Sequence, residues 1–262
     1  LLAQSNPTEA LSYFDRALAI NPNHFESIFK KAVTLARLDR HTEALAYFDA
    51  AISVNANAEA YYHKGKTLAK LGQTNDAILC MDKALELNPK YYDAFYHKGS
   101  LLSNPAEALS YFDRALAINP THFDSLFKKA VTLGKLNRHT EAISIYNTAL
   151  TIDPSNDTIL ANIGQALYHI GKATESLVYF DRALDINPIN TDTIHKKGAA
   201  LATIGKHTEA LSCFDQVLQL EPTHFDATYR KAMTLSVLSR HKDALICFDK
   251  ALKIAPNDIQ VL

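Results

Sequence analysis

A regularly recurring proline is the feature of this sequence that most constrains its fold. Prolines, with one alanine in the same role, recur along the 262 residues at Pro22, Ala56, Pro89, Pro120, Pro154, Pro188, Pro222 and Pro256. Successive positions are 34, 33, 31, 34, 34, 34 and 34 residues apart. Such a period is typical of repeat proteins, in which each unit is one supersecondary element that buries its apolar face only against its neighbours. The sequence therefore predicts a stacked array, an architecture that usually serves as a binding surface.

The bulk composition fits such an array and gives no sign of a charged partner. Hydrophobic residues make up 47% of the chain and charged residues 21%, and the net charge is -1. A near-neutral chain has no general attraction for nucleic acid or for anionic membranes, and no apolar run approaches the roughly 20 residues of a spanning helix. We therefore expect neither nucleic acid nor a membrane as partner. Residues 1–7 have neither an initiator methionine nor a signal-peptide pattern, so we expect a fragment of a longer array.

The three cysteines occupy one equivalent place, nine residues before the proline of their repeats. They are Cys80, Cys213 and Cys247, and other repeats have tyrosine or isoleucine there. A place that accepts these three residue types is a packing site. An odd number of cysteines also argues against a disulfide framework and favours free thiols in a reducing compartment. We therefore expect a cytoplasmic protein.

A single repeat has the pattern of two helices, which we call helix A and helix B. In residues 25–57, apolar residues at helical spacing precede and follow a short polar turn at 38–43. Asp39 in this turn is replaced elsewhere by glycine or asparagine, which tolerate the left-handed conformation that ends a helix. The Thr-Glu pair at 42–43 predicts the start of helix B, with the hydroxyl as its cap. Small residues on helix A permit close approach of helix B: Ala32, Gly65, Gly99, Ala130, Gly164, Gly198 and Ala232.

This pattern resembles the tetratricopeptide repeat family. The residues that carry the resemblance are Tyr61, Gly65, Leu68, Gly72, Ala77, Ala84 and Pro89 in one repeat, and Leu126, Ala130, Leu133, Ala142, Tyr146, Ala149 and Pro154 in another. The resemblance implies an all-α fold, a right-handed α-solenoid (αα-superhelix) of antiparallel helix pairs. It covers residues 1–262 as one array: a partial repeat at 1–24, full repeats at 25–57, 58–91, 92–122, 123–156, 157–190, 191–224 and 225–258, and the start of a further helix at 259–262.

Two departures from the regular pattern carry structural expectations. Lysine stands at the seventh place of most helices A, where the family often has leucine, and its aliphatic stem can cover apolar surface while the ammonium reaches water. These lysines are Lys31, Lys64, Lys98, Lys129, Lys197 and Lys231. The repeat at 92–122 is also three residues short, which predicts a helix A without its last turn, with Pro105 in the first turn of helix B and Asn104 or Ser103 as its cap.

The resemblance implies that helices A line a concave groove, and that this groove holds an extended peptide or a partner helix. Carried over to this sequence, the inward-facing places give an aromatic row beside a basic and imidazole row. Such a groove suits a peptide with apolar and acidic residues. The predicted partner-binding residues are Phe29, Lys30, Tyr62, His63, Lys66, Tyr96, His97, Phe127, Lys128, Asn162, Gln165, His195, Lys196, Tyr229 and Arg230.

A second interpretation of the same residues is structural. The second place of helix A is acidic in most repeats, so pairs such as Glu26–Lys30 can form along one helix and neutralise the groove locally. The aromatic rings can likewise pack on the next repeat rather than on a ligand. We do not expect a clamp for the C-terminal carboxylate of chaperone tails, because no ninth place carries the asparagine that this clamp uses.

No motif in the sequence indicates catalysis. His-Thr-Glu recurs at 41–43, 139–141 and 207–209, but the Pro-Cys-x-x-Cys of zinc deaminases is absent. His63 and His97 have no companion at a metal-ligand spacing. We therefore expect no cofactor, no metal and no enzymatic activity, and a scaffold or adaptor for other proteins. The alternatives are a substrate-docking arm of a larger enzyme or effector, and a structural array that self-associates through ends near residues 1–2 and 259–262.

Overall fold

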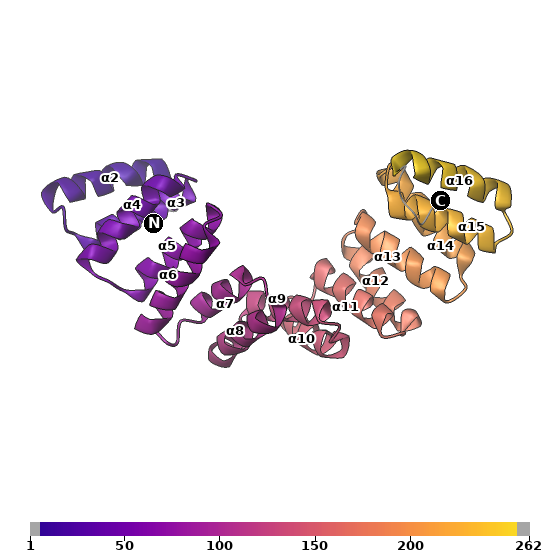
Figure 1. Ribbon diagram of the computed structural model, residues 1–262, viewed down its shortest axis with the longest axis horizontal. Helices are drawn as coiled ribbons and strands as arrows, with labels where there is room; N and C mark the ends of the chain where they lie inside the picture. Colours follow the sequence, from indigo (N-terminus) through magenta and orange to yellow (C-terminus); the bar gives the residue numbers. More distant parts are fainter. Residues whose placement is uncertain (1–5, 256–262) are drawn as a thin grey trace. The chain divides into compact units, whose positions relative to one another are not determined.

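The computed structural model describes residues 6–255, which form fifteen α-helices and no strand. Figure 1 follows them along the chain. The helices A are α3 (Phe25–Arg37), α5 (Ala58–Lys70), α7 (Tyr92–Leu101), α9 (Phe123–Lys135), α11 (Asp157–His169), α13 (Thr191–Thr203) and α15 (Phe225–Val237). The helices B are α2 (Pro7–Ile20), α4 (His41–Val54), α6 (Thr74–Leu87), α8 (Pro105–Ile118), α10 (His139–Ile152), α12 (Ala173–Ile186), α14 (His207–Leu220) and α16 (His241–Ile254).

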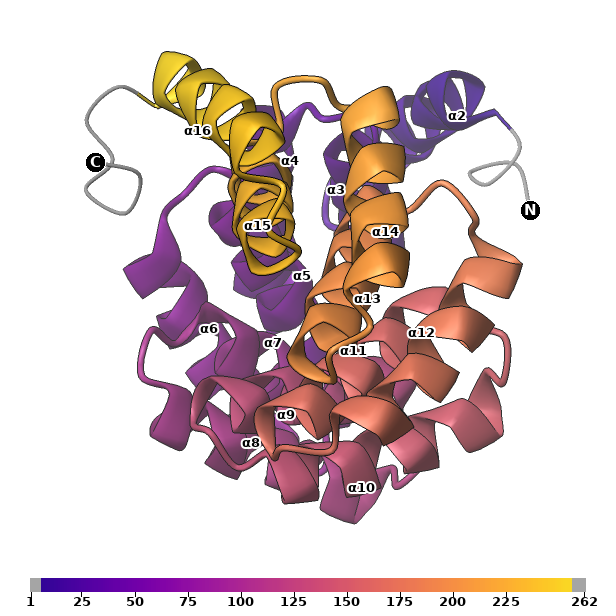
Figure 2. The same ribbon diagram turned by 90° about the vertical axis from the view of Figure 1, so that its right-hand side faces the viewer.

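Helices pack on their neighbours in sequence, as a solenoid requires. The most extensive contacts join the two helices of one pair, such as α5 with α6 and α11 with α12, and lesser contacts join a helix B to the next helix A, such as α4 with α5 and α12 with α13. The chain divides into two compact units, Leu1–Lys128 and Lys129–Leu262. Figure 2 shows the hairpins of the second unit, from α11 and α12 to α15 and α16. The predicted all-α solenoid of antiparallel helix pairs is confirmed, whereas a single array over 1–262 with the predicted repeat boundaries stays a prediction.

The turn between helix A and helix B has the left-handed residue that the sequence predicts. Asp39 and Asn137 have φ of 57° and 58°, and the three glycines Gly72, Gly171 and Gly205 have φ between 75° and 81°. The N–H of Arg40 then reaches back to the carbonyl of Leu35 at 3.0 Å, which satisfies a carbonyl that the helix end leaves open.

The last described turn has the same conformation in a residue that the pattern did not single out. Ser239 has φ of 58°, equal to that of Asn137. Serine is not a typical left-handed residue, so the residue type does not predict this conformation. The position of Ser239 in the repeat, equivalent to that of Asn137, does predict it.

The predicted hydroxyl cap of helix B is wrong. α4 begins at His41, so Thr42 lies inside the helix, and Arg40 is the N-cap residue without a side-chain cap hydrogen bond. The Arg40 guanidinium instead binds both carboxylate oxygens of Glu43, each at 2.7 Å. The same cation-to-carboxylate pair starts four other helices B: Arg138–Glu141, Lys172–Glu175, Lys206–Glu209 and Arg240–Asp243.

The short repeat has the predicted form. α7 ends at Leu101 after ten residues, whereas the other helices A have thirteen. α8 begins at Pro105, and the side chain of Asn104 accepts hydrogen bonds from the N–H groups of Ala106 and Glu107 at 2.9 and 3.3 Å. The deletion therefore removes the last turn of helix A and leaves helix B intact.

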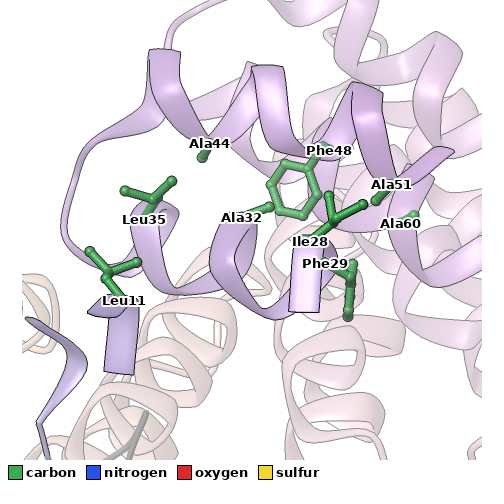
Figure 3. Packing of buried hydrophobic residues seen from close by; sticks show 9 residues of the cluster. All are labelled: Leu11, Ile28, Phe29, Ala32, Leu35, Ala44, Phe48, Ala51 and Ala60. Atoms are coloured by element: carbon green, nitrogen blue, oxygen red, sulfur yellow. The ribbon is translucent and has the colours of Figure 1, made fainter. Parts of the chain in front are cut away.

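From α3 and α4 to α13 and α14, each helix pair closes over a buried aromatic or thioether side chain from helix B. Figure 3 shows the first such core, where Phe48 of α4 lies beside Ala32 and Ile28 of α3. Phe48 is fully buried, as are Phe112, Phe180 and Phe214 in the equivalent place. The small residue on helix A is needed for this contact, because a Cβ added at Gly164 would lie 2.7 Å from a ring carbon of Phe180. Burial of each phenyl ring contributes about 1.5–3 kcal/mol.

The cysteines are packing residues, as predicted. Cys80 and Cys213 are buried and Cys247 is half-buried, and all three are free thiols. Burial raises the pKa of each thiol above its ordinary value, so the thiolate is disfavoured at neutral pH.

The lysines at the seventh place join successive repeats through ion pairs that the sequence pattern did not predict. Five of them reach an aspartate on the preceding helix B: Lys31–Asp15, Lys64–Asp49, Lys98–Asp82, Lys197–Asp181 and Lys231–Asp215. The side chains of Lys31 and Lys98 are only 11% exposed. Where α10 meets α11 both partners change together, because Asn147 replaces the aspartate and the fully buried Ile163 replaces the lysine.

Candidate partner-binding surface

The predicted site residues all lie on helices A, and we call the surface that they form in each unit the helix A face. Within it the aromatic rings are more buried than the charged side chains. Phe29 and Tyr62 are 7% and 6% exposed, whereas Lys30, Lys128 and Arg230 are exposed. The remaining predicted residues are half-buried: His63, Lys66, Tyr96, His97, Phe127, Asn162, Gln165, His195, Lys196 and Tyr229.

In the first unit the rings pack on one another from repeat to repeat. The ring centroids of Phe29 and His63 are 5.5 Å apart, those of Tyr62 and His97 5.3 Å, and those of Tyr96 and His122 5.3 Å. The first two contacts join consecutive repeats, and the third joins α7 to the residue that precedes α9. The rings therefore contribute to the stacking of helices A, as the structural interpretation of the sequence expects.

Burial keeps the imidazoles on this face neutral. It lowers the pKa of His63, His97 and His195 to about 4, with a smaller contribution from nearby cations: Lys66 for the first two and Arg230 for the third. At neutral pH these rings are therefore packing groups with one donor and one acceptor nitrogen, and they add no positive charge to the face.

Two of the predicted ion pairs along a helix are present. The ammonium of Lys30 lies 2.9 Å from the Glu26 carboxylate, and that of Lys196 lies 2.6 Å from the Asp192 carboxylate. Lys66 instead lies over the ring of Tyr62, with its ammonium 5.3 Å from the centroid. The positive charge of the helix A face is thus partly neutralised, but not at Lys66.

In the second unit the face is more polar near α11 and aromatic again at its end. Gln165 is hydrogen-bonded to His169 at 2.6 Å, and the side chain of Asn162 is hydrogen-bonded to Tyr146. His195 contacts Phe214 and His224, with centroids 5.9 and 5.3 Å apart. Tyr229 packs against Phe225 and Phe248.

A cavity lies at the same place of the repeat in each unit, between two successive helices A and the start of the helix B between them. In the first unit a cavity of about 380 Å³ is bounded by α3, α4 and α5, with Arg37, Lys66 and Lys70 in its wall. In the second unit a cavity of about 180 Å³ is bounded by α9, α10 and α11, with Gln165 and His169 in its wall. We call them the α3–α5 cavity and the α9–α11 cavity.

The residues predicted from the sequence include some of those that line each cavity and omit the others. His63 and Lys66 line one cavity, and Asn162 and Gln165 the other. Arg37, Lys70 and His169 were missed, although they occupy the thirteenth place of their helices, which also faces inward by the family pattern. The missed histidines His41 and His139 stand at the first position of a helix B.

A third cavity, of about 650 Å³, lies on helices B between α6 and α8. Its wall contains an ion pair of Lys83 and Glu86, at 2.7 Å, and Arg114, whose guanidinium lies 4.2 Å from the ring centroid of Phe95. Its charges are therefore of both signs and already paired or stacked.

Residues 6–255 contain no cluster of three or more His, Cys, Asp or Glu side chains that could hold a metal ion. Within that range, no helix has the length and apolarity to cross a membrane. The self-association surfaces predicted near residues 1–2 and 259–262 lie outside the described residues.

Models of the tetratricopeptide repeat match nearly the whole chain. Five with that description match residues 1–69, 58–91, 111–144, 158–187 and 195–259, and one described as TPR repeat matches 132–171. No curated protein sequence matches the chain significantly.

Solved structures with the same fold include two that are described as tetratricopeptide repeat proteins. YrrB, described as a TPR protein with an unusual peptide-binding site, is 26% identical, with a TM-score of 0.58 over 69% of this chain and 95% of its own. PilF of Pseudomonas aeruginosa is 19% identical, with a TM-score of 0.65 over 78% and 94%. A tetratricopeptide repeat protein from Parabacteroides merdae ATCC 43184 is 16% identical, with a TM-score of 0.60 over 89% and 94%. The latter two likenesses concern the fold alone.

Proposed function

Because this chain belongs to the tetratricopeptide repeat family, we propose that it is a non-catalytic scaffold that holds a peptide or helix of a partner protein along its helix A face. Membership of this family implies a protein–protein interaction scaffold. The proposal adds the place of binding and the kind of ligand, a segment with both apolar and acidic residues.

The observation that carries the proposal is the cavity that recurs between successive helices A. It occurs at the same place of the repeat in each unit, and its walls combine apolar atoms with polar side chains. Pockets of this kind suit anchoring side chains of a partner, and a repeat array offers several along one face. A protein with the same fold, YrrB, has a peptide-binding site.

The exposed cations beside the rings add a preference in charge. Lys30, Lys128 and Arg230 occupy the same place of α3, α9 and α15 and are exposed. Cations at the rim of an interface increase the rate of association with acidic partners.

A capture experiment with matched charge reversals tests the proposal. The variant Lys30→Glu/Lys128→Glu/Arg230→Glu changes the helix A face, and Lys83→Glu/Lys250→Glu/Lys253→Glu reverses the same number of exposed cations on helices B. Partners are captured from a lysate and identified for the wild type and both variants, and circular dichroism confirms that each variant is folded.

We expect the helix A variant to lose partners that the helix B variant retains. Retention by the first variant and loss by the second would instead assign recognition to helices B. Loss in both would indicate nonspecific attraction to positive charge, and would also contradict the proposal.

A further inference from the structure

Cationic side chains outnumber carboxylates in the wall of the α3–α5 cavity. Arg37, Lys66 and Lys70 contribute three cations, and Asp39 is the carboxylate in the wall. Asp39 lies 3.5 Å from the imidazole of His41. In the described part of the chain, no carboxylate lies within ion-pair distance of Lys66 or Lys70, so these two ammonium groups have donors to offer a ligand.

Part of the lining of this cavity is aliphatic. Val33 and Ala36 of α3 present aliphatic side chains to it. The hydroxyl of Thr67 on α5 donates to the carbonyl of His63 at 2.9 Å, so that hydroxyl is occupied within its own helix. The cavity is therefore lined by aliphatic side chains from α3 and ammonium groups from α5, with Arg37 at the end of α3.

The equivalent cavity in the second unit lacks this charge. Gln165 stands at the place of Lys66 and His169 at the place of Lys70, and the two are hydrogen-bonded to each other at 2.6 Å. The ring of His169 also stacks on that of His139, with centroids 4.8 Å apart. The α9–α11 cavity thus has the same position in the repeat, an internally satisfied polar wall and about half the volume, 180 against 380 Å³.

We infer that the α3–α5 cavity binds an acidic side chain of the partner peptide, with its methylene stem against Val33 and Ala36 and its carboxylate between Lys66 and Lys70. The inference rests on the proposed function and specifies one contact of that site. Hydrogen bonds from a cationic donor to a carboxylate are about twice as strong as neutral ones, and the aliphatic wall favours a side chain with methylene groups. An acidic side chain has both groups, a carboxylate for the ammonium groups and a methylene stem for the aliphatic residues.

Neutral His63 fits this assignment. Burial keeps its imidazole uncharged at neutral pH, so one ring nitrogen carries a proton that it can donate and the cavity gains no further charge. Three cations and one carboxylate therefore determine the charge preference of the cavity.

The test is an NMR titration of the whole chain with short synthetic peptides. The first peptide has blocked ends and one central glutamate, the second has glutamine in its place, and the third has glutamine and a free C-terminal carboxylate. We expect the glutamate peptide to shift the amide signals of Val33, Arg37, Lys66 and Lys70, and the glutamine peptide to leave them unchanged. Shifts with the third peptide alone would assign the cavity to a chain terminus and would overturn the assignment to a side chain.

Two variants exchange the chemistry of the two cavities. Lys66→Gln/Lys70→His copies the α9–α11 cavity into the first unit, and we expect about tenfold weaker binding of the glutamate peptide. Gln165→Lys/His169→Lys copies the α3–α5 pattern into the second unit, and we expect new shifts around Val131 and Gly134. The control Lys83→Gln/Lys253→Gln removes the same charge from helices B and leaves binding unchanged.

Three outcomes would overturn the inference. They are equal shifts at lysines over the whole surface, unchanged affinity in Lys66→Gln/Lys70→His, and no shift with the glutamate peptide. If charge reversal at Lys30, Lys128 and Arg230 still abolished partner capture in that case, the proposed function would stand and only the acidic contact in this cavity would be wrong.

Discussion

The α4–α5 junction and the α10–α11 junction occupy the same place of the repeat but differ in chemistry. At the first, Asp49 and Lys64 form an ion pair at 2.5 Å, whereas Asn147 and the fully buried Ile163 occupy these places at the second. The helices themselves have equal lengths, fourteen residues for α4 and α10 and thirteen for α5 and α11. One backbone arrangement thus accepts either a charged or an uncharged junction.

The difference shows which parts of the repeat are exchangeable. The left-handed turn residue and the small residue on helix A are present on both sides of the comparison, as Gly72 and Gly171 and as Gly65 and Gly164. The charged groups change only in pairs, because a partly buried ammonium without its carboxylate is strongly unfavourable. The cavities next to these junctions follow the same division, with Lys66 and Lys70 beside the charged junction and Gln165 and His169 beside the uncharged one.

The largest effect is expected from a charge placed in the uncharged junction. Ile163→Lys buries an ammonium opposite Asn147, and we expect it to lower the free energy of unfolding by about 3–5 kcal/mol. Urea unfolding followed by circular dichroism measures the loss.

A double variant distinguishes charge from packing in this result. Asn147→Asp/Ile163→Lys recreates the pair of Asp49 and Lys64, and we expect it to recover a substantial part of the lost stability. If the double variant were no more stable than Ile163→Lys, the paired exchange would have no electrostatic basis.

The second effect concerns pH and the imidazole of α5. The unfolded chain protonates His63 near pH 6.5, whereas burial delays protonation in the folded chain to about pH 4. The unfolded state therefore binds more protons between these values, and the free energy of unfolding falls as the pH decreases through this window, by on the order of 2 kcal/mol near pH 5 for one such histidine. Above about pH 7 this contribution to pH dependence vanishes.

His63→Asn copies the side chain that α11 has at this place, Asn162. Urea midpoints measured at several pH values should show a smaller decrease with acidification in this variant than in the wild type. Equal slopes would show that His63 is protonated alike in the folded and unfolded chains.

A smaller difference in stability is expected between alanine substitutions at the glycines of the two junctions. A Cβ at Gly164 would meet ring atoms of Phe180 at 2.7 and 2.8 Å, whereas the closest atom to a Cβ at Gly65 is the terminal methyl of Met81 at 2.9 Å. Overpacking costs about 1–3 kcal/mol, and the gain in helix propensity from glycine to alanine offsets about 1 kcal/mol of it. We expect Gly164→Ala to be less stable than Gly65→Ala in thermal unfolding, because methionine can move aside more easily than a phenyl ring. The opposite order would show that Phe180 is loosely packed.

The smallest effect is expected where the two regions are alike. Arg40 and Arg138 each bind a glutamate three residues on, at the exposed start of α4 and α10. Exposed pairs are screened by water and salt, so Arg40→Ala and Arg138→Ala should each leave the unfolding midpoint nearly unchanged and equal to each other. A large loss in one variant alone would reveal a role for that arginine beyond its ion pair.

The parts of the fold that depend on local sequence could be predicted. Pro105 and Asn104 mark the start of α8, and Gly72 or Asn137 marks a left-handed turn, because the residue type itself determines the conformation. The cap predicted at Thr42 was wrong. Threonine is a good N-cap residue, but α4 begins one residue before it, at His41.

The junctions could not be predicted because they depend on residues in different repeats. Lys64 and Asp49 are fifteen residues apart and meet only after two helices have stacked. The aromatic rings posed the same problem: the pattern placed Phe29 and Tyr62 on the inner face, but their burial follows from His63, His97 and Tyr91 of neighbouring segments. Arg37 and Lys70 could have been predicted, because the thirteenth place of helix A faces inward in the repeat pattern, but the predicted set did not include them.

The most direct test of recognition along the helix A face is site-specific photo-cross-linking to a captured partner. A benzophenone amino acid is placed singly at Lys30, Lys128 or Arg230 on helices A, and at Lys83, Lys250 or Lys253 on helices B as matched exposed positions. Mass spectrometry then identifies the cross-linked partner peptide at each position. The account predicts cross-links from the helix A positions to partner peptides and none from the helix B positions. Cross-links from helices B alone would contradict it.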